Sequence, residues 1–458
     1  MYRTNSENLE IKEALDFIDK HKAKLDRYKN LQNYYIGKHE IKETGGAAKD
    51  RNNKIVNPYP KYITDFHTGF FMGNSVRYTA TSEVDTHDDE FLEEYQEICV
   101  YNNEAKENLS LAKTNSIKGD SYEILWIDNN KKVRFKYLQP DNVFLIHGTS
   151  IDDKERFGVR YYNRTVGDRL INYIEIYDDV ACWYYDDSVD EGEYDLRKVT
   201  EHPFKAVPII HYVNNDELQG DFEQVKSLID AYNREESNTL NDMDEFSDAY
   251  LVLTGYGATT KEDIMKFKKD RILLNKHDGK AEWLTKEVND GWIENVKNRL
   301  NKDIHKFSFT PDFTDESFGT NLPGISLRLK LLTTEELRAT KELYFREGLI
   351  KRMDLIATYL NVTREHDIVR NEITISFSDA LPQNVLELTQ IINNLAADVS
   401  TETRLALLPM IEDPAAEMAK KQKEDMDAVA NFDIYANLGG HDDERQEVLA
   451  EEERRQAN

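Results

Sequence analysis

Two changes in hydrophobic periodicity predict a multidomain α+β protein. Over residues 7–35, apolar residues recur at spacings near three and four, which is typical of an amphipathic helix. From Gly119 to Val213 they alternate with polar residues, which is typical of strands. The helical spacing returns at Asp221. A chain of 458 residues with 39% hydrophobic residues is long enough for a sizeable core in each of several units.

The first half is predicted to mix helices and strands as far as about Gly220. Residues 7–35 are expected to form one helix, and Pro58 and Pro60 punctuate a strand-like entry to a packed helix that ends at Gly73-Asn74. Alternation around Asp128-Asn129-Asn130 predicts a hairpin followed by a third short strand. Further strands are expected at residues 158–163, 170–176, 181–185 and 207–213.

An acidic helix and a less acidic segment follow. Asp221 to Gln224 reads D-x-x-Q, which resembles a capping box with the aspartate as the cap. Nine acidic residues and two basic ones lie between Asp221 and Tyr250. Residues 251–307 begin with a short strand and end with a helix from Asp290. Because residues 261–306 hold twelve Lys or Arg against nine Asp or Glu, this segment suggests a separate surface with its own partner.

A break interrupts the helices at residues 309–323. It holds two prolines, and Thr310-Pro311 is expected to stop the preceding helix. Structureless loops of this length are uncommon unless they are functional. A helix then runs from Ile325 to about Leu360, or restarts at a T-x-x-E box that begins at Thr333. A strand within 371–382, short helices and an acidic end complete the chain.

Composition argues against several classes of protein. The chain has 87 Asp or Glu against 59 Lys or Arg, a net charge of −28, which repels nucleic-acid phosphates and anionic lipid. Cys99 and Cys182 lie far apart, which argues against a zinc site or a disulfide framework. The usual nucleotide-binding, hydrolase and metal-binding motifs are missing, so no enzyme activity, metal or cofactor is predicted. A metal-dependent nuclease among the many carboxylates is kept as an alternative.

Four stretches resemble the portal proteins of tailed bacteriophages of Gram-positive hosts, the long-tailed phage portal family. They occur in the family's order and are residues 53–65 with Gly69-Phe70 and Gly73-Asn74, residues 119–125, residues 220–233, and residues 399–403 with Asp413-Pro414. The break at residues 309–323, in which Gly-Thr-Asn-Leu-Pro-Gly precedes a long helix, resembles the tunnel loop of this family. The resemblance covers nearly the whole chain.

The resemblance implies a ring, usually of about twelve subunits, at one capsid vertex. Double-stranded DNA would pass through it during packaging and ejection. The implied partners are the large terminase subunit, the major capsid and scaffolding proteins and a head-completion adaptor, with no membrane. The implied locations are the virion and, during assembly, the host cytoplasm. A ring-forming scaffold or adaptor without DNA passage is the alternative.

The family architecture divides the chain into named domains. An α+β wing would comprise residues 1–220 and 324–384, and a helical stem would comprise 221–247 and 290–308. A small α/β clip would take 248–289, the tunnel loop 309–323 and a helical crown 385–458.

Three groups of residues are candidates for function. The tunnel-loop candidates are Asp312, Phe313, Thr314, Asp315, Glu316, Ser317 and Phe318; the two phenylalanines would pack the loop against its neighbour, and the carboxylates would face the lumen or subunit contacts. Stem carboxylates would line a channel wall that does not grip DNA, or else form an outward solvated face: Asp230, Glu235, Glu236, Asp242, Asp244 and Glu245. Basic clip residues would dock acidic partners, or else belong to an ordinary mixed-charge surface: Lys266, Lys268, Lys269 and Arg271.

Overall fold

A computed structural model describes most of the chain, and it confirms the mixed α+β class. The described residues are 2–43, 52–80, 86–246, 250–254, 260–262, 265, 280–284, 290–314, 324–364, 373–378, 385–395, 399–408, 411, 417–424 and 426. The chain divides into two units, Met1–Ala380 and Leu381–Asn458. In the second unit, the described part contains α10 (Val385–Asn394) and α11 (Thr401–Ala406), and the Ser400 side chain accepts the N–H of Thr403 at the start of α11.

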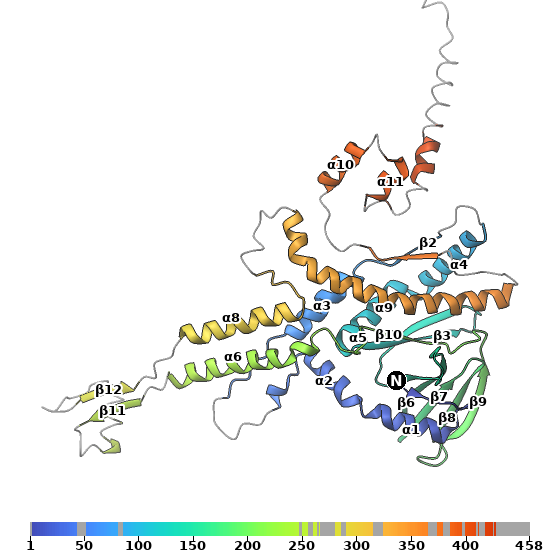
Figure 1. Ribbon diagram of the computed structural model, residues 1–458. Helices are drawn as coiled ribbons and strands as arrows, with labels where there is room; N and C mark the ends of the chain where they lie inside the picture. The colour runs from blue at the N-terminus through green and yellow to red at the C-terminus, as the bar shows by residue number, and fades with distance from the viewer. Residues whose placement is uncertain are drawn as a thin grey trace, which may run out of the picture. The chain divides into compact units, whose positions relative to one another are not determined.

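The largest sheet has six strands, and helix α1 (Ile11–Lys22) packs on it (Figure 1). Its order is β1-β5-β6-β7-β8-β9, antiparallel except for the β1/β5 pair. The predicted strands here are confirmed, but the exposed, polar β9 was not predicted. The strands are β1 (Tyr2–Arg3), β5 (Val143–His147), β6 (Glu155–Val166), β7 (Arg169–Tyr177), β8 (Ala181–Asp186) and β9 (Asp195–Glu201).

A three-stranded sheet shares one hydrophobic core with several helices. The predicted hairpin is confirmed as β3 (Asp120–Ile127) and β4 (Val133–Leu138), and β10 (Ile209–Val213) pairs with β3. Two adjacent helices that were not predicted, α4 (Thr86–Asn102) and α5 (Glu104–Lys118), contribute to the same core. Strands β2 (Arg77–Ala80) and β13 (Ile373–Ser376) pair although they are distant in sequence, and β13 confirms the strand expected within 371–382.

The single helix predicted for residues 7–35 is wrong, because the chain breaks between α1 and α2 (Leu25–Tyr35). Phe17 of α1 packs against the six-stranded sheet. Leu31 of α2 packs instead in a second cluster with residues of α5 and of α3 (Tyr59–Met72), a helix that ends at Gly73 as predicted. The break allows each helix to bury its apolar face in its own cluster.

Helix α9 (Gly324–Arg364) is continuous over 41 residues, which confirms the uninterrupted alternative. It contacts β10, α3 and α4. A Cβ atom added at Gly348 would lie 2.3 Å from Cε1 of Tyr212, so glycine at this position allows the helix to approach β10 closely. Arg352 is completely buried and donates to both carboxylate oxygens of Glu123 at 2.8 Å.

The capping role predicted for Asp221 is wrong. Its buried carboxylate accepts hydrogen bonds from Lys341 of α9, at 2.6 and 2.7 Å, and from Ser116 and Asn214. Burial alone would raise the pKa of Asp221, but the Lys341 ammonium holds it below its usual range. The chain passes through the short helix η2 (Glu223–Val225) before α6 begins at Lys226.

Candidate functional site

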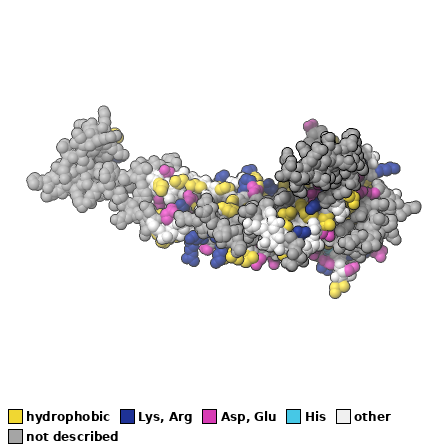
Figure 2. Space-filling model, turned by 90° about the horizontal axis from the view of Figure 1, so that it is seen from above, with side chains coloured by type: hydrophobic (Ala, Val, Ile, Leu, Met, Phe, Trp, Pro, Cys, Tyr) yellow, Lys and Arg dark blue, Asp and Glu magenta, His cyan; other side chains and the backbone are white. Residues whose placement is uncertain are grey.

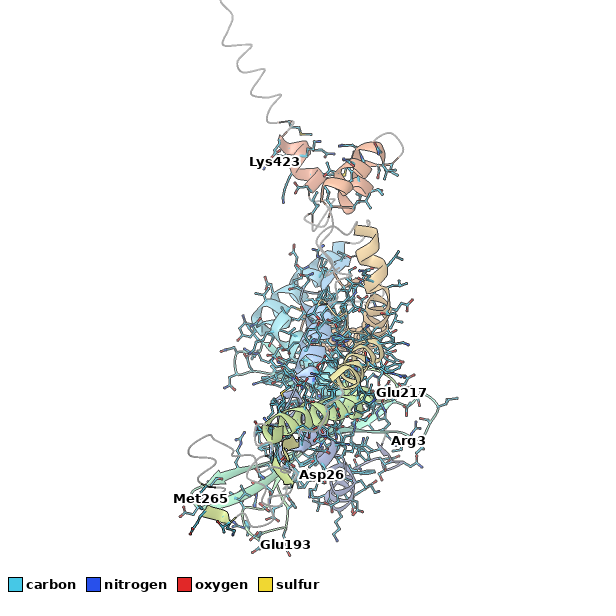
Figure 3. The ribbon with its side chains drawn as sticks, turned by 90° about the vertical axis from the view of Figure 1, so that its left-hand side faces the viewer. Arg3, Asp26, Glu193, Glu217, Met265 and Lys423 are labelled. Carbon is cyan, nitrogen blue, oxygen red and sulfur yellow. The ribbon has the colours of Figure 1, made fainter. Side chains whose placement is uncertain are left out.

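Helices α6 (Lys226–Phe246) and α8 (Asp290–Phe307) lie side by side and antiparallel (Figure 1). The bounds of α8 are those predicted. At the base of the pair, Ile229 and Ile304 are completely buried in one cluster. The other end leads into an antiparallel pair of strands, β11 (Tyr250–Thr254) and β12 (Lys280–Leu284). Figure 3 is viewed from this end and labels Met265, which is exposed.

Residues 52–58 form an extended segment along α6 and not a sheet strand. The N–H groups of Asn53, Ile55 and Asn57 donate to the side chains of Asn241, Ser237 and Asn233 at 2.8, 2.9 and 2.8 Å. The segment advances two residues for every four of α6, because two extended residues span about the rise of one helical turn. The polar face of α6 therefore satisfies this backbone.

The stem carboxylates point in different directions. Asp230 accepts a hydrogen bond from the Tyr34 hydroxyl at 2.8 Å, and burial raises the pKa of Asp230. Glu236 faces α8, where its carboxylate lies 2.8 Å from the Lys297 ammonium. Asp244 accepts from the Asn53 side chain at 2.7 Å. These three carboxylates therefore do not form one wall.

Two other candidates share a face of α6. Glu235 and Asp242 are seven residues apart, which places them within about 20° of each other around the helix. That direction points away from both Asp230 and Glu236. Glu245 lies on the same helix, but its side chain is outside the described residues.

The remaining candidates also lie partly outside the described residues. This applies to the clip residues Lys266, Lys268, Lys269 and Arg271, and to the loop residues Asp315, Glu316, Ser317 and Phe318. Three loop candidates are described, and they belong to a segment that we call the loop root, residues 308–314.

The loop root begins with a Schellman-type helix end. The Thr310 N–H bonds to the His305 carbonyl at 3.1 Å, and the Phe309 N–H bonds to the Lys306 carbonyl. Phe309 occupies the left-handed position, with φ +54°, where glycine is usual. Thr310-Pro311 was expected to stop α8, but the helix has already ended at Phe307, and the proline lies just beyond the motif.

The described loop candidates make contacts within their own chain. Asp312 accepts from the Asn301 amide at 2.9 Å and from the N–H and hydroxyl of Thr314 at 3.0 and 2.6 Å. Partial burial would raise the pKa of Asp312, but the hydrogen bonds from Thr314 and Asn301 keep it below its usual range. The ring of Phe313 is exposed, and its centroid lies 5.8 Å from the centroid of the Phe66 ring in α3.

Comparison with known proteins identifies the family. A family model for phage portal protein, SPP1 Gp6-like, matches residues 15–430. The chain belongs to this family. It is 24% identical to the portal protein of Bacillus phage SPP1 over 412 residues. This alignment covers 86% of this chain and 80% of that protein. It is 21% identical over 456 residues to the portal protein of Clostridium phage phiCD119, covering 94% of this chain and all of that protein.

Two solved structures resemble the fold at 13% identity. One is the neck of an empty GTA particle, with a TM-score of 0.47 and coverage of 77% of this chain and 90% of that chain. The other is the virion of a native gene transfer agent particle, with a TM-score of 0.48 and coverage of 83% and 92%. Membership of the portal family assigns the chain to the structural proteins of the phage particle.

On the face in Figure 2, basic, acidic and hydrophobic side chains of the described residues are interspersed. The described residues hold no group of three or more His, Cys, Asp or Glu suited to a metal ion. No helix in the described part is long and apolar enough to cross a membrane.

Proposed function

We propose that the chain forms a homo-oligomeric ring of about twelve subunits whose central channel passes double-stranded DNA into and out of the capsid. The observation that carries this proposal is the match of the portal family model over residues 15–430. The ring sits at one capsid vertex of the virion and is assembled in the host cytoplasm. It docks the large terminase subunit, the major capsid and scaffolding proteins and a head-completion adaptor.

The exposed outer part of the α6/α8 pair supports oligomerisation. Met243 and Trp292 are 59% and 60% exposed, whereas Ile229 and Ile304 at the base of the pair are completely buried. Met243 lies near the end of α6 and Trp292 near the start of α8, so both are at the same end of the antiparallel pair. Apolar side chains that are exposed together favour a protein contact. In a ring, a neighbouring subunit covers them.

The domain division of the portal fold belongs to the same proposal. The wing comprises residues 1–220 and 324–384, the stem 221–247 and 290–308, and the clip 248–289. The tunnel loop is 309–323 and the crown is 385–458. A pair of antiparallel helices, with a small β pair at one end and the loop root at the other, supports the stem assignment.

Two of the six stem carboxylates are the candidates for the channel wall. We propose that Glu235 and Asp242 line the channel, because they share one face of α6 and this face points away from the Tyr34 contact of Asp230 and the Lys297 contact of Glu236. Carboxylates on this face keep DNA hydrated without neutralising phosphates, so the duplex can slide. The basic clip residues, Lys266, Lys268, Lys269 and Arg271, dock acidic surfaces of the partners.

Electron microscopy of the purified protein, with class averages down the symmetry axis, tests the proposal. Rings with an open centre about the width of hydrated duplex DNA are expected. Closed rings too narrow for a duplex would instead indicate a scaffold or adaptor. Divalent-dependent cleavage of DNA by the purified chain would favour a nuclease and contradict the proposal.

A further inference from the structure

Four consecutive backbone carbonyls of the loop root each accept a hydrogen bond from a different side chain. The Ser308 carbonyl lies 2.9 Å from Nε2 of His67, and the Phe309 carbonyl accepts from the Thr334 hydroxyl at 2.7 Å. The Thr310 carbonyl lies 3.1 Å from Nδ1 of His305. The Pro311 carbonyl accepts from the Tyr62 hydroxyl at 2.9 Å.

These donors come from three helices that meet at the loop root. His67 and Tyr62 belong to α3, His305 to α8 and Thr334 to α9. A carbonyl oxygen can only accept, so Nε2 of His67 must carry a proton, as must Nδ1 of His305. Burial lowers the pKa of His67, which favours the neutral ring with its hydrogen on Nε2.

The backbone at the centre of these contacts is in an unfavourable conformation. Phe309 is left-handed, which costs an ordinary residue on the order of 1 kcal/mol relative to glycine. Such a conformation persists when the surrounding contacts over-determine it. The carbonyls of Ser308, Phe309 and Thr310 are all held, so the surroundings of Phe309 meet that condition.

We propose that His67, Tyr62, His305 and Thr334 are positioning residues that form a carbonyl clamp on the loop root. The clamp ties the start of the tunnel loop to the α+β body, by which we mean the six-stranded and three-stranded sheets with the helices packed on them, α9 included. Force on the loop is then transmitted to α3 and α9 and does not bend the chain at the end of α8. The role in the channel rests on the proposed function. The clamp itself does not.

Hydrogen exchange of the full-length protein tests the clamp directly. His67→Met and His67→Gln have similar length, but only glutamine retains an N–H donor. With His67→Met, the amides of residues 308–310 and 312–314 are expected to exchange about tenfold faster, since the buried Ser308 carbonyl keeps only the longer contact with the Thr310 hydroxyl at 3.3 Å. His67→Gln should restore slow exchange. Thr334→Val and Tyr62→Phe each remove one hydroxyl and should also accelerate it, which keeps the test valid if His67→Met fails to fold.

Thr68→Val is the matched control. Thr68 is buried on α3 next to His67, and its hydroxyl has no hydrogen-bond partner among the described residues. Exchange at the loop root should stay at the wild-type rate in this variant. Acceleration equal to that of His67→Met would mean general loosening of α3 and would overturn the clamp. Unchanged exchange in every donor variant would overturn it as well.

The channel role is tested by the DNA content of phage heads assembled with each chain. Variants that lose a donor should form rings as the wild type does but package or retain less DNA, and His67→Gln should recover. Normal DNA content despite fast exchange would overturn the role in positioning the loop. Wild-type heads that never contain DNA would contradict the proposed function, while the exchange result would still decide the clamp.

Discussion

Helix α9 and the α6/α8 pair are both long helical elements, but they are held by different interactions. The inner face of α9 carries Arg352, whose side chain is completely buried with that of Glu123. The α6/α8 pair relies at mid-length on Lys297 and Glu236, which are partly exposed, and its outer end leaves Met243 exposed.

The difference shows where the subunit resists deformation. A buried charge that loses its partner is strongly destabilising, so α9 must keep its place on the α+β body. A partly exposed ion pair contributes little, so the outer part of the helix pair can adjust at small cost. A stiff body with an adaptable helical extension suits a subunit that has to fit its neighbours in a ring.

Removing the Arg352 guanidinium should have the largest effect. Arg352→Met leaves the Glu123 carboxylate buried without its main partner, and burial already raises the pKa of Glu123. The free energy of unfolding should fall by about 3–5 kcal/mol, measured by urea denaturation of the transition that reports on the first unit. Arg299→Met on α8 is the control, because Arg299 is 85% exposed and 3.9 Å from Asp303. Equal losses in the two variants would remove the distinction.

Acid should weaken the α+β body through His21. Burial and the charge of Lys24 together lower the pKa of His21 to about 4, against the opposing charges of Asp120 and Asp141. Below about pH 6.5 the unfolded chain binds a proton that the folded chain does not. Stability should therefore fall by about 3 kcal/mol as the pH drops from 6.5 to 4. His21→Gln should lose this part of the pH dependence in urea titrations; an unchanged profile would contradict it.

Filling the close approach between α9 and β10 should have a moderate effect. Gly348→Ala forces a methyl group against the Tyr212 ring and should destabilise the protein by about 1–3 kcal/mol in thermal unfolding. Gly69→Ala in α3 is the control, because its Cβ would meet nothing within 4 Å. The control should be stabilising by about 0.5–1 kcal/mol, the usual gain for alanine over glycine in a helix. Stabilisation in both variants would mean that the packing between α9 and β10 is looser than described.

The smallest effect is expected in the helix pair. Lys297→Met should cost about 0.2–1 kcal/mol, because the ion pair with Glu236 is partly open to solvent. A double-mutant cycle with Glu236→Gln in urea denaturation measures the coupling between the two side chains. A coupling as large as that between Arg352 and Glu123 would mean that the pair is as rigid as the body.

The helices that could be predicted are those with one strong apolar face. The bounds of α8 follow from periodicity, whereas for α9 the sequence left a continuous helix and a restart at Thr333 both open, and the structure shows the continuous one. Helix α5 could not be found in this way, because it buries polar residues such as Asn108 and Lys118 on several sides and shows no apolar stripe. The capping role of Asp221 was predicted wrongly because its local motif suits a helix cap, whereas its main partner, Lys341, is 120 residues away.

The candidate site was predictable as a segment but not in detail. The break after α8 is visible in the proline and glycine content of the sequence, and the structure describes its first residues. The donors His67, Tyr62 and Thr334 leave no local signal, because their acceptors are main-chain carbonyls and no complementary side chain appears in the sequence. The left-handed Phe309 is also invisible, since glycine is the residue that usually marks this position.

The main-chain acceptors at the loop root determine which positions are free to vary among related phages. Every amino acid supplies the same carbonyl, so the acceptor at Phe309 is preserved by any residue that tolerates the left-handed backbone there. The donors have no such freedom, because only a few side chains can replace His67 or Thr334. The side chain at the left-handed position can therefore vary, while the restrictive donor positions His67 and Thr334 lie hundreds of residues apart on separate helices.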